Sequence, residues 1–507
     1  MEQTTILVMI LTIISKIFGF VRESVMAAYI GAGDLKSIYT TATTVPNMLV
    51  GVVSVGIISG YVPIYNKIRN DEGEFKANDF TSNLINILLV YGTLVFIIVL
   101  IFARPIAKLF SPDLKGADLN LAINYIRIIM ISLYSFLYAA VIKGYLNVKN
   151  NFIDPILPGI ILNIFIILST ILTSLFKNPY ILIIGTLLGY ISSYFRFPLV
   201  SRKLGFVYKR KIDLSNKYLK SLMLIIIPIV ISSAADQIAL VVDNSMASAF
   251  FGVSSVSKIF YSKTMLDFIM GVVTLSIATV TFPEIAKLGQ LGDFERMKSK
   301  IISAIVFSMI LVIPSTFGMM ALSNPIIKIA FERNAFTASD TEIVASLLVS
   351  YAPYVIFASL IKILSNGFYS VGDSKTPLII ILIQQVLNIF MNVILSKIFG
   401  LDGLAYATSV STFVSSILLV LAFRKKFGRF ESNKYIISIL KIFVVSILMF
   451  IVAKLTYSNL NSSRSFIISL LGTVMIASIV YLLGIIILKI PEFNQFLQTV
   501  NNRNKKE

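Results

Sequence analysis

Long apolar segments follow one another along almost the whole chain. Each exceeds the ~20 residues with which an α-helix, rising ~1.5 Å per residue, crosses a hydrocarbon core of ~30 Å. A membrane β-barrel would instead show segments of ~10 residues with alternating polarity. The pattern therefore predicts an all-α polytopic membrane protein with fourteen transmembrane helices. They are expected at residues 5–30, 37–65, 80–102, 119–147, 154–176, 179–201, 217–250, 256–286, 298–322, 340–370, 376–399, 402–424, 435–456 and 465–489.

Basic residues stand mostly in the short loops between these segments. Charged residues make up only 14% of the sequence, yet the formal net charge is +19. Because short loops rich in Lys and Arg stay in the cytoplasm, the clusters indicate topology and contacts with membrane lipids rather than nucleic-acid binding. With an even number of spans they fall on one side, which predicts two cytoplasmic termini. The clusters are Arg202, Lys203, Lys209, Arg210, Lys211 and Lys217; Lys287, Arg296, Lys298 and Lys300; Arg424, Lys425, Lys426 and Arg429; and Arg503, Lys505 and Lys506.

The composition and the motifs exclude several kinds of chemistry. The chain has no Cys and no His, which excludes disulfides, thiol catalysis, Cys/His metal sites and a His proton relay. The sequence also lacks a Walker A loop, a nucleophile elbow and an HExxH motif. We therefore expect a transporter and not an enzyme, driven by an ion gradient or by the membrane potential. The N-terminus has no basic n-region, so a cleaved signal peptide is not expected.

The sequence repeats itself at an offset near 220 residues. Because six spans separate the matching positions, the two halves have the same orientation, and a pseudo-two-fold axis along the membrane normal relates them. This predicts an N-terminal lobe of six helices at 1–215, a C-terminal lobe of six helices at 216–430, and two extra helices with a cytoplasmic tail at 431–507. The matches are Gly51, Pro63 and Lys67 with Gly271, Pro283 and Lys287; Glu23 with Asp243; Gly144-Tyr145 with Gly367-Phe368; and Leu-Asn-Ile-Phe at 162–165 with 387–390.

Three charged residues, Lys16, Arg22 and Glu23, stand inside the first apolar segment. Each costs about 2.5–3.5 kcal/mol at the centre of a membrane helix, so we expect these side chains to face a protein cavity or water. An alternative interpretation is that the side chains of Arg22 and Glu23 extend to one membrane surface. Lys16 lies too close to the middle of the span for that explanation.

The eighth segment carries Lys263 and Asp267, which are four residues apart on one helix face. One interpretation is a structural ion pair between the lobes. The functional interpretation is that Lys16, Arg22 and Lys263 converge on a cavity between the lobes, where their positive charge holds an anionic headgroup.

A second set of polar residues suits a small cation. Asn388 and Asn392 are separated by four residues in the eleventh segment, and Thr408 lies in the twelfth. Such residues often form hydrogen bonds between helices. Together with Asp243, the counterpart of Glu23 in the repeat, they also supply the oxygen ligands that Na⁺ needs.

The N-terminal motifs resemble those of the MurJ/MviN family of lipid II flippases, within the MOP flippase superfamily. The matching residues are Ser15-Lys16-Ile17-Phe18-Gly19-Phe20-Val21-Arg22-Glu23, Gly31-Ala32-Gly33, Val45-Pro46-Asn47 and Tyr61-Val62-Pro63. The resemblance implies a protein of the bacterial cytoplasmic membrane that flips lipid II for peptidoglycan synthesis and cell shape. It implies a central cationic cavity to which Lys16, Arg22 and Glu23 contribute, and a groove for the polyprenyl tail lined by spans thirteen and fourteen. It also implies a Na⁺ site at Asp243, Asn388, Asn392 and Thr408.

The chain departs from the family pattern at several positions. No Lys or Arg occurs between Met48 and Tyr65, where the family carries Arg. Thr264 stands where an Arg is expected, Asp267 replaces a Glu, and Asn392 replaces an Asp. A flippase for another polyprenyl-diphosphate oligosaccharide, such as a teichoic or capsular precursor, therefore remains an alternative. A cation-coupled drug antiporter would need a cavity dominated by carboxylates and aromatic residues, and a scaffold without transport would leave the intramembrane charges unexplained.

Overall fold

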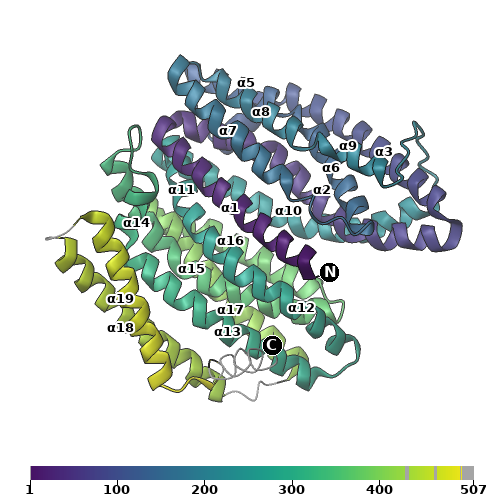
Figure 1. Ribbon diagram of the computed structural model, residues 1–507. Coiled ribbons are helices and arrows are strands. Elements are labelled where there is room, and N and C mark those ends of the chain that lie inside the picture. The colour runs from purple at the N-terminus through teal and green to yellow at the C-terminus, as the bar shows by residue number, and fades with distance from the viewer. Residues whose placement is uncertain (1, 429–432, 462–464, 492, 494–507) are drawn as a thin grey trace. The chain divides into compact units, whose positions relative to one another are not determined.

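The computed structural model describes residues 2–428, 433–461, 465–491 and 493 (Figure 1). Every apolar segment predicted from the sequence is largely helical. Eleven helical segments among the described residues are long and apolar enough to cross a membrane. The predicted class, an all-α polytopic membrane protein, is therefore confirmed, and the number of fourteen spans stays a prediction.

The first of two compact units comprises Met1–Ser257 together with Phe331–Thr337. Helix α2 is central to it, because α3, α5, α6 and α10 all pack against this helix. Helix α1 packs against α7, and α7 packs against α8. The helices of unit 1 are α1 (Glu2–Ile30), α2 (Asp34–Glu72), α3 (Glu74–Ile101), α4 (Ala103–Phe110), α5 (Gly116–Ile129), α6 (Ser132–Val148), α7 (Leu157–Phe176), α8 (Tyr180–Ser193), α9 (Arg196–Lys203) and α10 (Lys217–Phe251).

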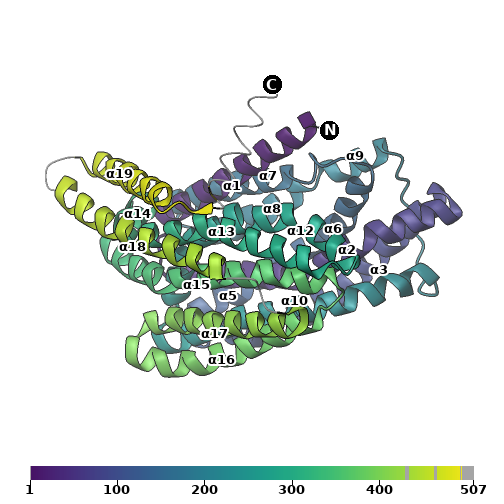
Figure 2. The ribbon, with the colours of Figure 1, turned by 90° about the horizontal axis from the view of Figure 1, so that it is seen from below.

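The second unit comprises Lys258–Ala330 and Ala338–Glu507. Helices α16 and α17 lie side by side in it, and α18 and α19 form a second pair, of which α18 packs on α13 (Figure 2). The lobe boundaries predicted at residues 215 and 430 come from the sequence repeat, and they stay predictions. The helices are α11 (Ser254–Ile269, which begins in unit 1), the π-helical turn η1 (Met270–Thr274), α12 (Leu275–Gln290), α13 (Phe294–Ala321), α14 (Ser323–Phe331), α15 (Ala338–Ser370), α16 (Lys375–Phe399), α17 (Leu401–Phe427), α18 (Asn433–Asn461) and α19 (Phe466–Ile487).

Three of the predicted segments are interrupted helices. The segment at 179–201 divides into α8 and α9 at Tyr194, because the ring of Pro198 would clash with the carbonyl group four residues earlier. The segment at 119–147 divides into α5 and α6, where the Ser132 hydroxyl donates a hydrogen bond of 2.6 Å to the carbonyl of Ile129. The segment at 256–286 contains η1. These interruptions leave the helical class unchanged but bend the elements.

The dipeptide Gly144-Tyr145 allows close helix packing in the core of unit 1. A Cβ at Gly144 would lie 2.6 Å from the ring of Tyr61, so the missing side chain lets α6 approach α2. The next residue, Tyr145, is fully buried and its ring centroid lies 5.8 Å from that of Tyr65.

The matching dipeptide in unit 2 has the same kind of contact. A Cβ at Gly367 would lie 2.7 Å from the rings of Phe423 and from Ile301, which brings α15 close to α17 and α13. Phe368 is fully buried and its ring centroid lies 5.7 Å from that of Phe423. Gly144 in unit 1 and Gly367 in unit 2 therefore each allow helices of their own unit to approach closely.

Candidate functional site

A buried ion-pair cluster joins the C-terminal half of α1 to the first turn of α2. The Glu23 carboxylate accepts hydrogen bonds from Arg22 Nε at 3.0 Å, from Arg22 Nη2 at 2.6 Å and from Lys36 Nζ at 2.8 Å. The side chains of Glu23 and Lys36 are 4% and 1% exposed, and that of Arg22 is 25% exposed. Because buried charges are costly unless they are paired, Glu23 is the group that permits two cations here.

The turn between α1 and α2 brings the cluster together. Gly31 has a φ of +79°, the left-handed region that glycine adopts without steric cost. A Cβ at this position would also lie 2.6 Å from the carbonyl oxygen of Ala335, in the short segment of unit 1 that follows α14. The Gly31-Ala32-Gly33 motif therefore reverses the chain within three residues and places Lys36 beside Glu23.

A pocket of about 600 Å³ opens beside this cluster within unit 1. Among the residues that the structure describes, three basic side chains line it and no carboxylate does: Lys16 and Arg22 come from α1, and Lys143 comes from α6. Helices α2, α7 and α8 complete its wall. Its remaining lining residues are Thr12, Ser15, Asn47, Phe136, Pro155, Ile156, Pro158, Gly159, Leu162, Tyr190, Ser193 and Tyr194.

Neighbouring side chains orient two of the three cations of this pocket, Arg22 and Lys143. Arg22 Nη1 donates to Asn163 Oδ1 at 3.0 Å, so two planar groups, the Asn163 amide and the Glu23 carboxylate, fix the guanidinium. Lys143 Nζ lies 5.5 Å from the centroid of the Tyr194 ring, within the range of a cation–π contact. We call this site, defined by Lys16, Arg22 and Lys143, the cationic pocket.

The structure brings some of the predicted binding residues together. Lys16 and Arg22 line one pocket, whereas Glu23 is absent from the pocket lining and neutralises Arg22 and Lys36 behind it. Sequence reasoning missed Lys143, although this residue is also a charge inside a predicted span, the signal that identified Lys16. Lys36 was missed because it lies one residue before the second predicted segment.

Lys263 and Asp267 belong to a different unit from the cationic pocket. Both lie on α11 in unit 2, where Lys263 Nζ is 5.0 Å from the centroid of the Tyr351 ring. The convergence of Lys263 with Lys16 and Arg22 stays a prediction.

The candidate sodium ligands are divided between the units. Asn388 Nδ2 donates to Thr408 Oγ1 at 3.3 Å, and Asn392 Nδ2 donates to Asn388 Oδ1 at 3.1 Å, all within unit 2. Asp243 belongs to unit 1. The amide and hydroxyl oxygens have the chemistry that Na⁺ requires, but those of Asn388 and Thr408 already accept hydrogen bonds. A cation at these residues would exchange hydrogen bonds for ion contacts.

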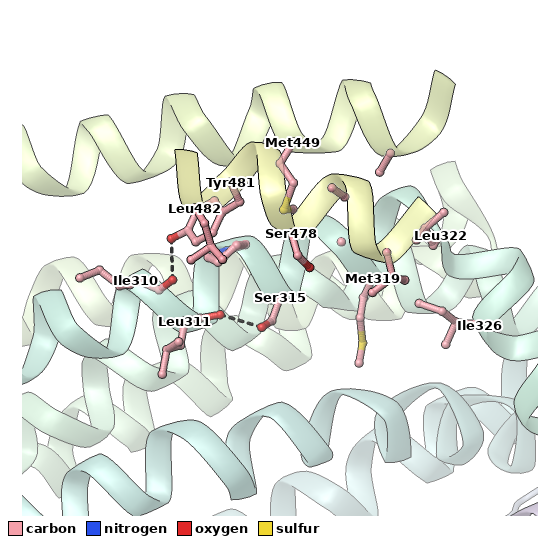
Figure 3. Close-up of a pocket in the computed structure, with 15 residues that line it drawn as sticks. Ile310, Leu311, Ser315, Met319, Leu322, Ile326, Met449, Ser478, Tyr481 and Leu482 are labelled. Atoms are coloured by element: carbon pink, nitrogen blue, oxygen red, sulfur yellow. Dashed lines mark hydrogen bonds between the residues drawn. The ribbon is translucent and has the colours of Figure 1, made fainter. Parts of the chain in front are cut away.

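An apolar pocket of about 480 Å³ lies within unit 2 between α13, α14, α18 and α19 (Figure 3). Its walls are aliphatic side chains and Met residues, among them Met319 and Met449. Two of its three hydroxyl groups bind the backbone: Tyr481 Oη donates to the carbonyl of Ile310 at 2.5 Å, and Ser315 Oγ donates to that of Leu311 at 2.7 Å, whereas Ser478 adds a third hydroxyl to the lining (Figure 3). The pocket therefore presents an apolar surface, which suits a hydrocarbon chain. We call it the apolar pocket.

The sequence matches one protein family over most of its length. A family model described as "Lipid II flippase MurJ" matches residues 26–489. Similar proteins include a "Probable lipid II flippase MurJ" of Vibrio cholerae serotype O1, which is 29% identical over 430 residues, 82% of each chain. Another protein of that description, from Buchnera aphidicola subsp. Acyrthosiphon pisum, is 26% identical over 506 residues and covers 96% of this chain and 98% of its own.

The fold also matches solved structures. A structure described as "Lipid II flippase MurJ, inward closed conformation" superposes with a TM-score of 0.81 and 26% identity, over 94% of this chain and 98% of the other. An inward-facing multidrug resistance MATE family transporter of the MOP superfamily superposes with a TM-score of 0.70 over 82% of this chain and 94% of the other. At 16% identity, the second match speaks for the fold alone.

Proposed function

The chain belongs to the lipid II flippase MurJ family, and we propose that it moves lipid II across the bacterial cytoplasmic membrane with the diphosphate of the headgroup in the cationic pocket. A flippase is a transporter and not an enzyme. The observation that carries the proposal is the lining of this pocket by Lys16, Arg22 and Lys143 without a carboxylate.

The chemistry of the cationic pocket suits a diphosphate. Arg22 presents a planar guanidinium, which matches the geometry of phosphate oxygens, while Lys16 and Lys143 add flexible ammonium groups. Asn47 and Tyr190 add amide and hydroxyl groups for the sugars, and Asn47 Nδ2 lies 3.4 Å from Tyr190 Oη. Lys143 offsets the lack of basic residues between Met48 and Tyr65. Lipid II and another polyprenyl-diphosphate oligosaccharide share this diphosphate, so the family match and not Lys143 favours lipid II.

The apolar pocket is our candidate for the polyprenyl tail. Transfer of hydrocarbon between lipid and an apolar protein surface has little cost, so the tail can stay beside α18 and α19 during transport. Polar headgroup and apolar tail would then be recognised by different sets of helices.

The transport cycle that we propose is alternating access. In this scheme the chain has fourteen spans, arranged as two six-helix lobes and an appended pair, with both termini in the cytoplasm. The two lobes would rock around the headgroup and expose it first to one side of the membrane and then to the other. Lys263 and Asp267 contribute to headgroup binding in this scheme.

Sodium coupling is a further part of the proposal. Asp243, Asn388, Asn392 and Thr408 would hold the ion, which adds a positive charge whose gradient supplies energy. Asn392 carries no charge, so Asp243 is the only carboxylate of the set.

Two experiments test the proposed function. Purified protein in vesicles should move lipid II between leaflets, and its expression should keep alive a bacterial strain depleted of its own flippase. Failure in both assays overturns the proposal. The substitution Arg22→Glu should abolish both activities, because it replaces the guanidinium in the pocket by a carboxylate that repels phosphate. Arg104→Glu, an exposed charge reversal on α4, is the matched control and should retain activity.

A further inference from the structure

An extended segment of unit 1, residues 204–216, connects α9 to α10 and lies along α3; we call it the basic strap. Four buried polar side chains on one face of α3, at i, i+4, i+5 and i+8, bind its backbone. Asn86 Nδ2 donates to the carbonyls of Lys209 and Lys211, both at 2.9 Å. Asn83 exchanges two hydrogen bonds with the backbone of Asp213, at 2.8 and 2.7 Å. Asn78 and Ser82 bind the carbonyl of Gly205 and the amide of Lys209.

These hydrogen bonds explain why an irregular segment is ordered at the end of a membrane helix. Extended backbone needs partners for its N–H and C=O groups wherever water is scarce. The amide side chains of α3 supply these partners, and the strap is therefore held to unit 1 by hydrogen bonds.

The strap closes one side of a separate pocket of about 250 Å³. Ile85 and Leu89 of α3 and Phe206 of the strap give it an apolar wall. Arg202 of α9, Tyr138 of α6 and Tyr208 of the strap give it polar groups. None of its lining residues belongs to the cationic pocket. We call it the strap pocket.

The strap pocket stands at the end of membrane-spanning helices. Arg202 is the penultimate residue of the apolar segment Tyr180–Lys203, and Leu89 lies within the segment Glu74–Ile101. Arg202 therefore lies near the end of an apolar segment, where lipid headgroups are expected, and Ile85, Leu89 and Phe206 place apolar side chains beside it. Tyrosines such as Tyr138 and Tyr208 are typical of this region of membrane proteins.

The charge around the strap pocket favours an anion. The carboxylates of Asp79 and Glu72 are engaged by Lys209 at 2.7 Å and by Lys217 at 2.8 Å. Arg202, Arg210 and Lys211 are exposed, and within the described residues no ion pair is formed by them.

Apolar side chains are exposed beside these cations. Phe195, just before α9, and Leu214 on the strap are each 72% exposed, and Val207 on the strap is 65% exposed. Basic residues next to exposed apolar residues are typical of a surface in contact with anionic lipid.

From these observations we propose that the strap pocket binds an anionic phospholipid of the surrounding membrane. Its phosphate contacts the Arg202 guanidinium, since the Tyr208 hydroxyl already donates to Asn86 Oδ1. The first part of an acyl chain packs on Leu89, in the apolar wall that this residue forms with Ile85 and Phe206. The volume is less than half that of the cationic pocket, so it accommodates a glycerol-phosphate group and not the large headgroup of the transported lipid. This lipid is a resident ligand and not the cargo.

The test uses full-length protein in vesicles made of equal amounts of phosphatidylcholine and phosphatidylglycerol. After detergent extraction, mass spectrometry measures the ratio of the two lipids that remain bound. The wild type should be enriched in phosphatidylglycerol. Arg202→Gln should lower the enrichment about fivefold, the factor that corresponds to ~1 kcal/mol for one basic residue at an anionic surface. Lys203→Gln is the matched control, because it removes the same charge from the next residue, which does not line the pocket.

A second pair of variants tests the apolar wall without changing any charge. Leu89→Phe fills the pocket and should lower the enrichment, whereas Val90→Phe on the same helix should not, because Val90 is exposed and outside the pocket. Lys143→Gln in the cationic pocket should leave the enrichment unchanged, which separates this lipid from the cargo. The proposal is overturned if the wild type shows no enrichment, or if Arg202→Gln and Lys203→Gln act equally while Leu89→Phe has no effect. Size-exclusion profiles verify that each variant is folded.

Discussion

The two largest of the pockets described above have opposite chemistry. The cationic pocket of unit 1, at about 600 Å³, is lined by three basic side chains and by amide and hydroxyl groups. The apolar pocket of unit 2, at about 480 Å³, directs the hydroxyls of Tyr481 and Ser315 into its own backbone and presents hydrocarbon. Transfer of charge into a membrane is costly, whereas transfer of hydrocarbon is not. Under the proposed function, the cationic pocket of unit 1 would hold the polar end of the transported lipid and the apolar pocket of unit 2 its tail.

The largest expected effect concerns the ion pairs behind the cationic pocket. Glu23→Gln leaves the buried Lys36 ammonium without its carboxylate and should lower the free energy of unfolding by about 3–5 kcal/mol. Thermal unfolding in detergent measures the loss. The double variant Glu23→Gln/Lys36→Met, which removes both charges, should recover most of it. If the single variant is as stable as the wild type, the cationic pocket does not depend on this cluster.

The next effect tests the third cation of the same pocket. Lys143→Gln should weaken the binding of lipid II by about ten- to a hundredfold, because a charge-assisted hydrogen bond to phosphate contributes ~1.5–3 kcal/mol. Lys143→Arg should retain the affinity, since it keeps the charge. Lys76→Gln, an exposed substitution on α3, is the control. Equal affinities of Lys143→Gln and the wild type would remove Lys143 from the headgroup site.

The apolar pocket is tested by filling it. Ser478→Phe adds an aromatic ring to the lining of the pocket and should lower affinity severalfold for lipid II with its full polyprenyl tail, but not for an analogue with a short tail. Met475→Phe adds similar bulk on the exposed face of α19 and serves as the control. An equal loss for both tail lengths would show that this pocket does not distinguish the tail from the headgroup.

Much of the difference between the two pockets could be predicted from the sequence. The features that could not be predicted depend on contacts between segments that are far apart in the sequence. The apolar segments identified the helices, and charges inside a span identified Lys16 and Arg22, because both signals are local. The role of Glu23 could not be predicted, since it depends on Lys36, which is brought alongside only by the turn at Gly31. Lys143 carried the same local signal as Lys16, but nothing in the sequence placed α6 and α1 around one pocket.

The smallest expected effect concerns two loops, one in each unit, that precede α7 and α16. Asp154 accepts from Arg196 Nε at 3.0 Å in unit 1, and Asp373 accepts from Lys426 Nζ at 2.5 Å in unit 2. Each carboxylate precedes the helix of the fifth predicted span of its lobe. Its cation differs in position, because Arg196 lies within the sixth predicted span and Lys426 follows the twelfth. Each unit therefore contains a carboxylate–cation pair at this turn, but from different positions.

The pH dependence of stability tests the pair in unit 2. Burial alone would raise the pKa of the Asp373 carboxyl, but hydrogen bonds from Lys426 and from Thr376 outweigh it and hold the pKa below the usual 3.8. A carboxyl with a lowered pKa stabilises the fold above its unfolded pKa, and this contribution is lost as the pH falls through the folded value. The unfolding free energy should therefore decline below about pH 4 by less than ~1 kcal/mol from this pair. Asp373→Asn should remove that part of the decline, and an unchanged profile would show that the Lys426 pair does not stabilise unit 2.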